Sequence, residues 1–517
     1  MRFHPGYMAL AGLLALPWLW PFTFGPQAGV QPWLVSAAMG AVLLALWPRA
    51  RAAGVRVAAL GWLGAALVSS LIALAQYFDV EAPLFPWVNQ AQPGQAFGNL
   101  RQPNQLATLL VMGLLALRWL GGQRHWVRLP PVALAGLGAL LLVGLAATAS
   151  RVGLVALLAV GGLALWWGWR TRCDAGGAGD GQQALPFSWL GATVLAALAL
   201  YVLAALALPM LLAQGEGVAG RSMVDRLQHA EGTCGSRLIL WDNVLHLIAQ
   251  KPWTGWGWSE LAYAHYITLY EGARFCHILD NAHNLPLHLA VELGVPVALA
   301  ACALVLWLVW RGQPWAEADA ARQLAWGVLA VIGIHSLVEY PLWYGPFQIA
   351  ALVSVWILLA SDAPAVPASA WPRRAVAALV LGAVAYAGWD YHRVSQIYLP
   401  AEQRAAAYQG DAMGHARRSW LYADVVRFAE VTSRPATRAN AAWMLPAALQ
   451  ALHFSPEPRV IVKVIESATL LGQDDVALLH LARFRAAFAQ EHRRWADDNQ
   501  RALEGARELA ASGAAAR

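Results

Sequence analysis

Long apolar stretches alternate with short polar segments over roughly the first 390 residues of the chain. Many of these stretches are about 17–25 residues long, the length that a helix needs to cross roughly 30 Å of hydrocarbon. We therefore predict an all-α polytopic membrane protein with about eleven transmembrane helices. The predicted spans lie near residues 7–24, 31–48, 56–78, 105–120, 131–148, 152–169, 188–213, 285–310, 322–340, 345–360 and 373–389.

The pattern changes in the tail, from about residue 390 onward. Apolar side chains there recur at the i, i+3, i+4 spacing of amphipathic helices, as in RSWLYADVVRFAEVTSR and DDVALLHLARFRAAFAQEHRRWADD. Successive helix pairs suggest a small helical domain, of which a tetratricopeptide-like repeat is one form, although no repeat period is visible. We predict two domains. Residues 1–389 form a transmembrane domain that includes a long polar loop at 214–284, and residues 390–517 form a C-terminal α-helical domain.

Composition strengthens the prediction of a membrane protein. The chain is 59% hydrophobic and only 13% charged, whereas about a quarter of the residues of a soluble domain are charged. The net charge of +6 does not indicate nucleic-acid binding, because the arginines lie mostly in short loops between spans. The first apolar stretch is bulky and no small-x-small cleavage site follows it, so we interpret it as a retained span rather than a signal peptide.

The arginines also predict the orientation, because cytoplasmic loops carry an excess of Lys and Arg. With a cytoplasmic N-terminus, alternate loops carry that excess, at Arg49, Arg51, Arg56, Arg118, Arg124, Arg128, Arg170, Arg172, Arg311, Arg322, Arg373 and Arg374. Loop 173–187 reads as flexible and cytoplasmic. The tail and the other loops, at 79–104, 148–151, 214–284 and 341–344, then face the exterior side. An error of one span would move the tail to the other side.

Two of the four cysteines, Cys234 and Cys276, share the long exterior loop. In an oxidising compartment these two could form a disulfide. The bridge would close a loop of about 40 residues and contribute roughly 3–4 kcal/mol. The alternative is two unpaired thiols.

Polar residues gather on the predicted exterior side in several places. The first is FGNLRQPNQLATLL at 97–110, which concentrates polar side chains just before a span, at Asn99, Arg101, Gln102, Asn104 and Gln105. Pro103 suits the first position of a helix, and the free N–H groups of a helix start, with Arg101 beside them, could bind an anion. Capping needs one polar residue rather than five, which favours a functional role.

Two isolated arginines occupy the next two places. Arg151 lies in the turn TASRVGL, and Arg237 begins an amphipathic helix predicted from Ser236 to Ala249. Each has a structural alternative, because a boundary arginine often only extends its charge to the headgroups and one at a helix end is often only solvated. KPWTGWGWSE, which follows the helix, is typical of a membrane-surface loop, so we expect this helix to lie on the bilayer.

The fourth place is DNAHNLPLHLAVELG at 280–294. His283 lies beside Asp280, Asn281 and Asn284, which suits a general base with hydrogen-bonding neighbours. The alternative is a histidine that caps a span. His288 does not share a helical face with His283 and reads as an ordinary polar residue of the helix.

HSLVEYPLWYGPF at 335–347 adds Glu339 and Tyr340. An aromatic belt explains the tyrosine but not a glutamate at membrane depth. No HxxxH or carboxylate–histidine spacing supports a zinc site, so we expect neither a metal nor another cofactor. Arginines, amides and one histidine then indicate a transfer reaction. Arginine would bind a diphosphate leaving group bidentately, histidine would deprotonate a neutral acceptor, and stabilisation of the leaving diphosphate would contribute most to the rate.

Together, FGNLRQPNQLA, SRVGL, the RLILW and PWTGWG segments, NAHN and HSLVEYPLWY resemble the bacterial O-linked protein oligosaccharyltransferases (PglL type), relatives of the O-antigen ligases. The resemblance runs in order through about residues 95–350, and the helical tail is similar to the C-terminal domain of that family. The NLRQPNQLA block and the tail favour the protein-glycosylating branch.

This resemblance implies a multi-pass protein of the bacterial inner membrane whose active site, long loop and tail face the periplasm. The donor would be an oligosaccharide on undecaprenyl diphosphate, transferred en bloc and without a metal to a Ser or Thr hydroxyl of an exported protein such as a pilin. The essential residues of the family map onto His283 as the catalytic histidine, Arg151 and Arg237 as diphosphate ligands, Gln102 or Gln105 as a functional glutamine, and Tyr340 as a functional tyrosine.

One departure and several alternatives remain. The ligases carry Gly, Thr or Tyr three residues after the glycine that follows their His-Asn pair, whereas Val297 stands three residues after Gly294 here. An O-antigen ligase acting on lipid A-core and an O-antigen polymerase are the alternatives within the superfamily. A transporter or flippase would show inverted repeats and charged or broken helices in the bilayer centre, and neither is visible. A purely structural protein would not require the Arg/His set.

Overall fold

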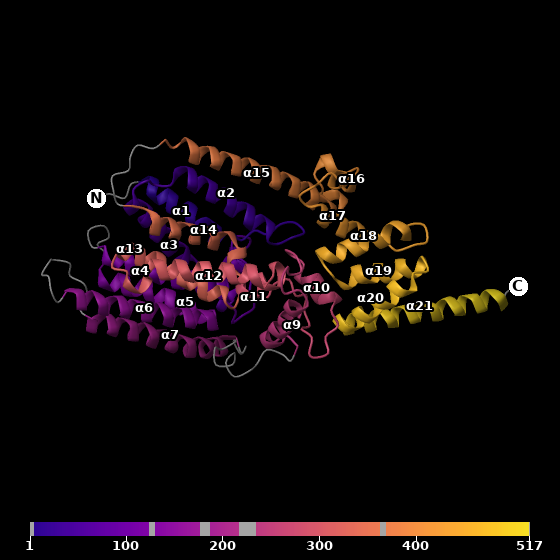
Figure 1. The fold of residues 1–517 in the computed structure, drawn as a ribbon, viewed down its shortest axis with the longest axis horizontal. Coiled ribbons are helices and arrows are strands. Elements are labelled where there is room, and N and C mark those ends of the chain that lie inside the picture. The colour runs from indigo at the N-terminus through magenta and orange to yellow at the C-terminus, as the bar shows by residue number, and fades with distance from the viewer. Residues whose placement is uncertain (1–4, 124–129, 176–186, 217–233, 362–368, 516–517) are drawn as a thin grey trace. The chain divides into compact units, whose positions relative to one another are not determined.

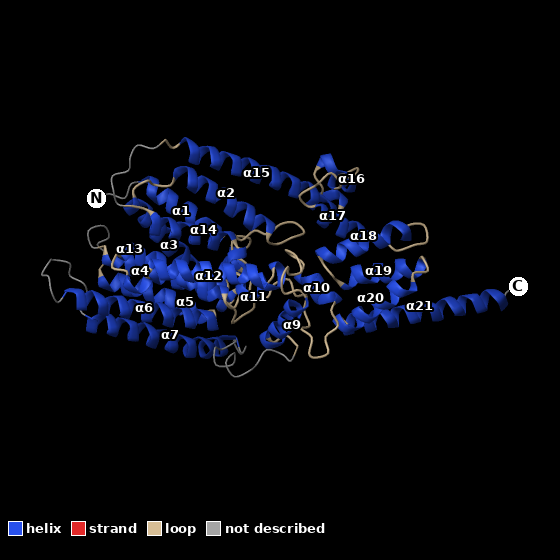
Figure 2. Ribbon diagram, in the orientation of Figure 1, coloured by secondary structure: helices blue, strands red, loops and turns tan. Residues whose placement is uncertain are grey.

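The computed structural model describes residues 5–123, 130–175, 187–216, 234–361 and 369–515. Throughout these ranges the regular elements are helices and none is a strand (Figure 2), which confirms the all-α prediction for the described residues. The chain divides into two compact units, of which the first comprises Met1–Ala230 and Leu304–Trp389 and the second Glu231–Ala303 and Asp390–Arg517. Arg124, Arg128, most of loop 173–187 and the first part of loop 214–284 lie outside the described residues.

The first unit is built around two buried helices, α3 (Arg51–Tyr77) and α4 (Pro103–Gly122), which pack against each other (Figure 1). Both are apolar on most of their surface, which is the pattern of a helix buried in a large core or in a membrane. Around them lie α1 (Pro5–Leu19), α2 (Val30–Leu46), α5 (Pro131–Ala147), α6 (Arg151–Ala175), α7 (Phe187–Glu216), α13 (Ala320–Ser336), α14 (Gly345–Leu359) and most of α15 (Trp371–Ser395).

Five helices of the described chain are long and apolar enough to cross a membrane, and four shorter ones are also apolar. The five are Arg51–Tyr77, Pro103–Gly122, Arg151–Cys173, Leu190–Ala213 and Val295–Ala316. Every predicted span except 285–310 overlaps a single helix. A single helix therefore lies at ten of the eleven predicted spans. The number of these helices that cross a bilayer stays a prediction.

The prediction of one continuous span at 285–310 is wrong. The structure contains a nine-residue helix, α11 (Leu285–Leu293), and then α12 (Val295–Gly312), separated by Gly294 at φ 90°. A side chain at Gly294 would place its Cβ 2.3 Å from the carbonyl oxygen of Trp253, and one at Gly255 would come equally close to the carbonyl oxygen of Glu292. Two glycines thus let the backbone of the TGWG turn lie directly against the end of α11.

Backbone hydrogen bonds stabilise this contact between the TGWG turn and the end of α11. The amides of Trp256 and Gly257 donate to the carbonyls of Val291 and Glu292, each at 2.9 Å, and the amide of Val295 donates to the carbonyl of Pro252 at 2.8 Å. These bonds satisfy carbonyls that the end of a helix would otherwise leave without partners. The TGWG turn is therefore a structural partner of α11, and the break in the predicted span has a local cause.

The second unit combines the long loop with the tail. Its loop part contains α9 (Arg237–Gln250), α10 (Leu261–Ile267), α11 and the start of α12. Its tail part contains α16 (Ala412–Ala416), α17 (Ala423–Ser433), α18 (Ala441–Phe454), α19 (Pro458–Leu470), α20 (Asp474–Ala487) and α21 (Ala489–Ala515). Successive tail helices from α17 to α20 pack against each other (Figure 1), as the amphipathic pattern of the sequence predicted.

One helix of the loop belongs to the hydrophobic core of the tail. Tyr266 of α10 is 2% exposed among apolar side chains of α17 to α20, and its hydroxyl shares a 2.8 Å hydrogen bond with Nδ1 of His480. Burial lowers the pKa of His480 to about 4, with Arg483 nearby adding to the shift. The domain prediction placed loop 214–284 with residues 1–389, whereas residues 234–284 of that loop belong to the same compact unit as the tail.

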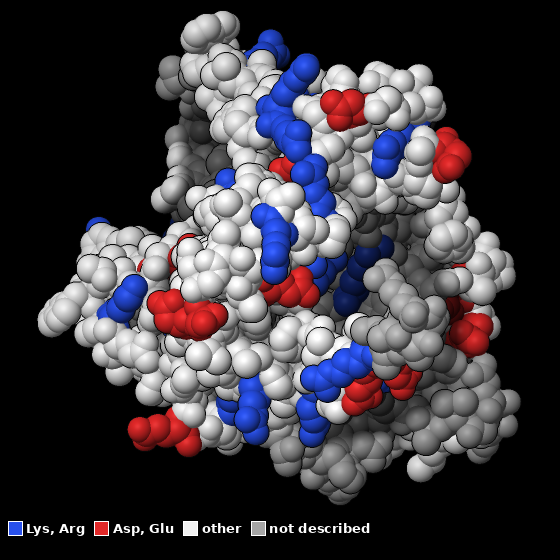
Figure 3. Space-filling view, turned by 90° about the vertical axis from the view of Figure 1, so that its right-hand side faces the viewer, with Lys and Arg blue, Asp and Glu red and all other residues white. Residues whose placement is uncertain are grey.

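Charged side chains of both signs lie on the face drawn in Figure 3. Several Lys and Arg side chains gather along the middle of this view, and Asp and Glu side chains lie beside them.

Candidate functional site

The start of α4 carries the first group of predicted site residues. Gln102 is the N-cap, and its side-chain oxygen accepts a 2.7 Å hydrogen bond from the amide of Gln105. Pro103 takes the first helical position, as predicted, because its missing N–H would have no partner there in any case. Gln105 is 3% exposed, and its Oε1 has no hydrogen-bond partner among the described residues.

Asn104 connects this helix start to two distant segments of the first unit. Its Oδ1 accepts a 2.7 Å hydrogen bond from the hydroxyl of Ser150, and its Nδ2 donates to Oε1 of Glu339 at 3.3 Å. The hydroxyl of Ser150 also accepts from the amide of Gly153 at 3.0 Å, so it caps the start of α6. One amide therefore links the turn before α6 with the segment after α13.

A small hollow lies at this junction. It is lined by Gln102, Gln105, His335, Glu339, Tyr340, Pro341 and Tyr344. Glu339 is 6% exposed, which fits the expectation that a glutamate at this depth needs partners. The tyrosine rings of Tyr340 and Tyr344 stack with centroids 5.8 Å apart. The structure thus brings together four predicted residues, Gln102, Gln105, Glu339 and Tyr340.

The sequence did not single out His335, and it named Asn104 only as one of five polar residues before the span. His335 is fully buried, and its Nδ1 lies 2.9 Å from the hydroxyl of Thr108. Asn104 makes the connections described above. Both lie inside quoted motifs, but only their long-range contacts separate them from residues that merely cap or anchor a helix.

Arg151 is the first residue of α6 and follows Ser150 directly. Its side chain is exposed, and it forms no ion pair or hydrogen bond with any described residue. Other arginines near helix starts, such as Arg51 and Arg322, pair with acidic residues. The guanidinium of Arg151 is therefore available for an anion from outside the described chain.

Arg101 and Asn99 take a different role. The guanidinium of Arg101 donates to the hydroxyl of Thr23, to the carbonyl of Pro21 at 2.9 Å and to Oδ1 of Asn89 at 3.0 Å. Asn99 donates to the carbonyls of Leu19 and Trp87 at 2.7 and 2.9 Å. Both side chains therefore hold loops together, and neither lines the hollow at Glu339.

In the second unit, the chain around His283 is shaped by close neighbours. His283 has φ 49°, the left-handed region that a residue with a side chain rarely occupies. Its amide donates to Oδ1 of Asn281 at 2.8 Å, and Oδ1 of Asn284 accepts from the amide of Leu287 at 3.0 Å. Asn284 is thus the N-cap of α11, and the turn before it presents the partly exposed imidazole of His283.

His288 is not the ordinary polar residue that the sequence indicated. It is 3% exposed, and its Nε2 lies 3.4 Å from Oε2 of Glu292, one helical turn further along α11. A buried imidazole paired with a buried carboxylate needs an explanation, because the transfer of such groups out of water is costly.

Arg237 begins α9, as predicted, and Ser236 caps that helix by accepting from the amide of Ile239 at 3.3 Å. Cys234 and Cys276, the pair singled out from the sequence, form a disulfide with Cα atoms 5.4 Å apart. The bridge joins the chain just before α9 to the segment that leads to His283.

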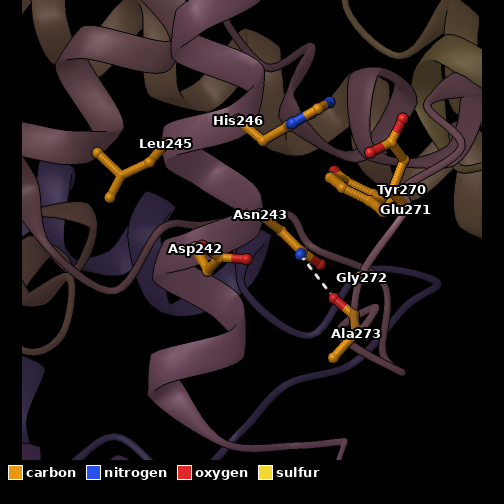
Figure 4. A pocket seen from close by; sticks show the side chains of 8 residues that line it. All are labelled: Asp242, Asn243, Leu245, His246, Tyr270, Glu271, Gly272 and Ala273. Carbon is orange, nitrogen blue, oxygen red and sulfur yellow. Dashed lines mark hydrogen bonds between the residues drawn. The ribbon is translucent and has the colours of Figure 1, made fainter.

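A second hollow, of about 270 Å³, lies beside α9 (Figure 4). Its lining consists of Asp242, Asn243, Leu245, His246, Tyr270, Glu271, Gly272 and Ala273. Asn243 fixes one wall, because its Nδ2 donates to the carbonyl of Ala273 at 2.9 Å. The lining contains two carboxylates and no Lys or Arg, so this hollow is unsuited to a diphosphate.

Within the described ranges, no three His, Cys, Asp or Glu side chains come close enough together to bind a metal ion. The predicted site residues that remain as candidates for chemistry are arginines, amides, a carboxylate, a tyrosine and His283. The hollow at Glu339 and Arg151 belong to the first unit, and His283 and Arg237 belong to the second.

Comparisons with known proteins bear on what these residues do. Sequence models of three families match the chain. They describe a protein glycosylation ligase over residues 96–120, an O-antigen ligase over 136–302, and the C-terminal part of a virulence factor membrane-bound polymerase over 323–503. The matches together span the start of α4, the turn of Arg151, the loop of His283 and the tail.

A curated relative agrees with the first two models. The chain is 25% identical over 358 residues to a General O-oligosaccharyltransferase of Acinetobacter baylyi. The aligned region covers 66% of this chain and 57% of that relative, so the match spans little more than half the relative's length. These findings confirm the resemblance that the motifs predicted, to the O-oligosaccharyltransferases of the O-antigen ligase superfamily.

Proposed function

We propose that this protein is a membrane glycosyltransferase that moves a whole oligosaccharide from undecaprenyl diphosphate to Ser or Thr hydroxyls of exported proteins such as pilins. The observation that carries this proposal is the protein glycosylation ligase match at residues 96–120. That segment contains Gln102 and Gln105, which line the hollow with Glu339, and Asn104, which donates a hydrogen bond to Glu339. The relative from Acinetobacter baylyi, named as an O-oligosaccharyltransferase, points the same way.

The proposed chemistry is a single displacement at the anomeric carbon. The acceptor oxygen bonds to that carbon while its bond to the diphosphate oxygen breaks, and the diphosphate leaves with the electron pair. His283 accepts the hydroxyl proton, a task for which an imidazole is suited near neutral pH. Arg151 and Arg237 bind the diphosphate and stabilise the charge that develops on it. No metal and no other cofactor takes part in this scheme.

The hollow at Glu339 is proposed to hold polar parts of the donor or acceptor. Gln105 is the stronger candidate of the two glutamines, because its buried Oε1 has no described partner, whereas Oε1 of Gln102 caps α4. A hydroxyl of the donor or acceptor that donates a hydrogen bond to Oε1 of Gln105 would give that oxygen a partner. Tyr340 and Glu339 offer further hydrogen-bonding groups beside it. Arg101 and Asn99 are assigned to support these loops rather than to the donor.

The proposed location is the bacterial inner membrane with His283 on the periplasmic side. The apolar helices support a multi-pass protein. The disulfide between Cys234 and Cys276 supports an oxidising compartment for the loop that carries His283. The arginine-rich loops of the sequence support the same orientation.

A second candidate is a polymerase or ligase whose acceptor is another glycan. It is favoured by the polymerase model over residues 323–503 and by the O-antigen ligase model over residues 136–302. The donor chemistry would be the same in both cases. Only the source of the attacking hydroxyl would differ.

The test compares cells that make the wild-type protein with cells that make His283→Ala. We expect the intact mass of exported glycoproteins to fall by the mass of one glycan in the variant, with unchanged levels of the transferase in the membrane. His277→Ala, which alters an exposed histidine of the same loop, is the matched control and should keep full transfer. Full transfer by His283→Ala would refute the role of this residue. Unchanged protein masses together with shortened lipopolysaccharide ladders would establish the second candidate instead.

A further inference from the structure

Two side chains, the buried His288 and the partly buried Trp241, hydrogen-bond to the backbone of Ala282, the residue before His283. The amide of Ala282 donates to Nδ1 of His288 at 3.5 Å, and its carbonyl accepts from Nε1 of Trp241 at 3.0 Å. Ala282 itself is fully buried in a small cluster with side chains of α9 and α11. Side chains of two helices therefore fix the backbone immediately before His283.

This backbone is one that the chain would not adopt by itself. A left-handed conformation at a residue other than glycine costs about 1–3 kcal/mol and persists only where surrounding contacts enforce it. His283 has φ 49°, and the bond from its amide to Asn281 is local. The contacts of Ala282 supply the long-range part of that enforcement.

His288 can hold Ala282 only in one form. Because Nδ1 accepts the amide hydrogen of Ala282, the ring proton lies on Nε2, where it can be donated to the carboxylate of Glu292 at 3.4 Å. The backbone of Ser259 and Leu261 beside Glu292 favours its ionised form. The carboxylate thereby orients the imidazole, much as the outer partner of a histidine does in metal and acyl-transfer sites.

The electrostatics of the pair agree with this arrangement. Burial lowers the pKa of His288 to about 4, and the neighbouring His283 adds to the shift. Burial also raises the pKa of Glu292 to about 7, so its ionised and protonated forms are both present near neutral pH, and each has an oxygen that can accept from Nε2 of His288. His288 is therefore neutral at physiological pH, which leaves Nδ1 free of a proton and able to accept.

We infer that His288, oriented by Glu292 and assisted by Trp241, is a positioning residue that sets the placement of the His283 imidazole. This inference rests on the proposed catalytic role of His283. It assigns a task to a histidine and a glutamate that the transfer chemistry itself does not use. An imidazole displaced by about 1 Å from its reaction geometry loses on the order of 100-fold in rate.

Three substitutions of His288 separate its hydrogen bond with Ala282 from its contact with Glu292. Asparagine can place Oδ1 where Nδ1 stands and so keep the acceptor for Ala282. Glutamine can place its amide near Nε2 and so keep the contact with Glu292, while leucine keeps neither. We expect kcat to fall about 10- to 100-fold in His288→Gln and His288→Leu, with KM for donor and acceptor unchanged. His288→Asn should retain most of kcat, which a role limited to filling the core would not explain.

Trp241→Phe provides a second route to the same test, because it keeps an aromatic ring and removes only the donor to the carbonyl of Ala282. We expect a similar fall in kcat. In a His283→Ala background, neither His288→Gln nor Trp241→Phe should reduce the residual rate further, because residues that act as one unit are not additive. Wild-type kcat in folded His288→Gln and Trp241→Phe proteins would overturn the inference.

Amide hydrogen exchange tests the positioning without reference to activity. In the detergent-solubilised full chain, exchange of a peptide covering residues 280–287 should be about tenfold faster in His288→Gln than in wild type. His288→Asn should stay close to wild type. Unchanged exchange in His288→Gln would refute the positioning even if His283 proves catalytic. Faster exchange together with full activity of His283→Ala would instead support the positioning of this backbone by His288 and refute the proposed function.

Discussion

In the first unit, Asn104, Ser150 and Glu339 come from segments far apart in the chain and meet through side-chain hydrogen bonds. In the second unit, the turn that presents His283 is shaped by Asn281 and Asn284 within a few residues, and a disulfide and two helices then secure it. The first group depends on how helices pack, whereas the second depends on local backbone geometry. The two groups should therefore fail in different ways when they are altered.

The largest effect is expected where the backbone of the second unit has no room. Gly294→Ala would strain a residue at φ 90° and drive a Cβ to within 2.3 Å of the carbonyl oxygen of Trp253. We expect a loss of about 3 kcal/mol or more in the stability of the second unit, together with the loss of glycan transfer. Thermal unfolding and transfer assays measure both. Gly162→Ala in α6, where a Cβ meets nothing within 4 Å, is the control and should change stability by less than about 1 kcal/mol. A stable and active Gly294→Ala protein would show that the crossing with the TGWG turn is dispensable.

A change of intermediate size is expected at the junction of the first unit. Asn104→Ala removes the partners of Ser150 and Glu339 and should cost about 1–3 kcal/mol of stability, with transfer reduced at least about tenfold. Asn104→Asp keeps an acceptor for Ser150 but places a second carboxyl group next to Glu339, so it should be no better than alanine. If Asn104→Asp restores wild-type transfer, the link to Glu339 is not what matters at this junction.

Acid should weaken the second unit through buried histidines. Burial depresses the pKa of His480 to about 4 and that of His265 to about 3, where Arg274 adds to the shift. Each is neutral in the folded state, so the stability it contributes is complete above its unfolded pKa of about 6.5 and is lost as the pH falls toward the folded value.

At pH 5 we expect each of these two histidines to have cost roughly 2 kcal/mol of that stability. Denaturant unfolding at pH 7 and pH 5 measures the loss, which should be smaller by roughly 2 kcal/mol in His480→Phe. His277→Phe, at an exposed site, should leave the pH dependence unchanged. Equal slopes in all three proteins would show that His480 is not buried as a neutral group.

The smallest effects should distinguish Arg151 from Arg101, two arginines of the first unit. Arg151→Lys keeps the charge but loses bidentate binding, and we expect the KM for the lipid-linked donor to rise about tenfold. Arg101→Lys removes hydrogen bonds to Pro21 and Asn89 and should lower the unfolding temperature by a few degrees with little change in KM. The opposite pattern would reassign the anion site to Arg101.

Sequence reasoning succeeded where the signal is local. The start of α9 at Arg237, the first-turn proline of α4 and the helical tail all follow from capping chemistry and apolar spacing within a few residues. The polar segment before α4 was correctly singled out as a group. The sequence could not tell the roles of its members apart. Arg101 holds loops together and Gln105 lines a hollow, and this difference depends on partners from other segments of the chain.

Contacts across long stretches of chain account for what the sequence did not reveal. Arg51, expected as a loop charge, is 7% exposed and donates to both carboxylate oxygens of Asp319 at 2.9 and 3.0 Å. The burial of His288 accompanies the packing of α11 against α9, and no spacing rule within α11 reveals that packing. The break at Gly294 was missed because an apolar run of sufficient length is read as one span unless the backbone crossing is known.

Tyr266 has a practical consequence for engineering. Its side chain lies in the core formed by α17 to α20, although it is separated from those helices in sequence by α12 and the chain up to α15. A chimaera that exchanges only residues after 390 between two related chains would pair a foreign core with this tyrosine and leave a cavity or a clash. Chimaeras should therefore take residues 234–303 and 390–515 from the same parent, so that the two segments are exchanged together.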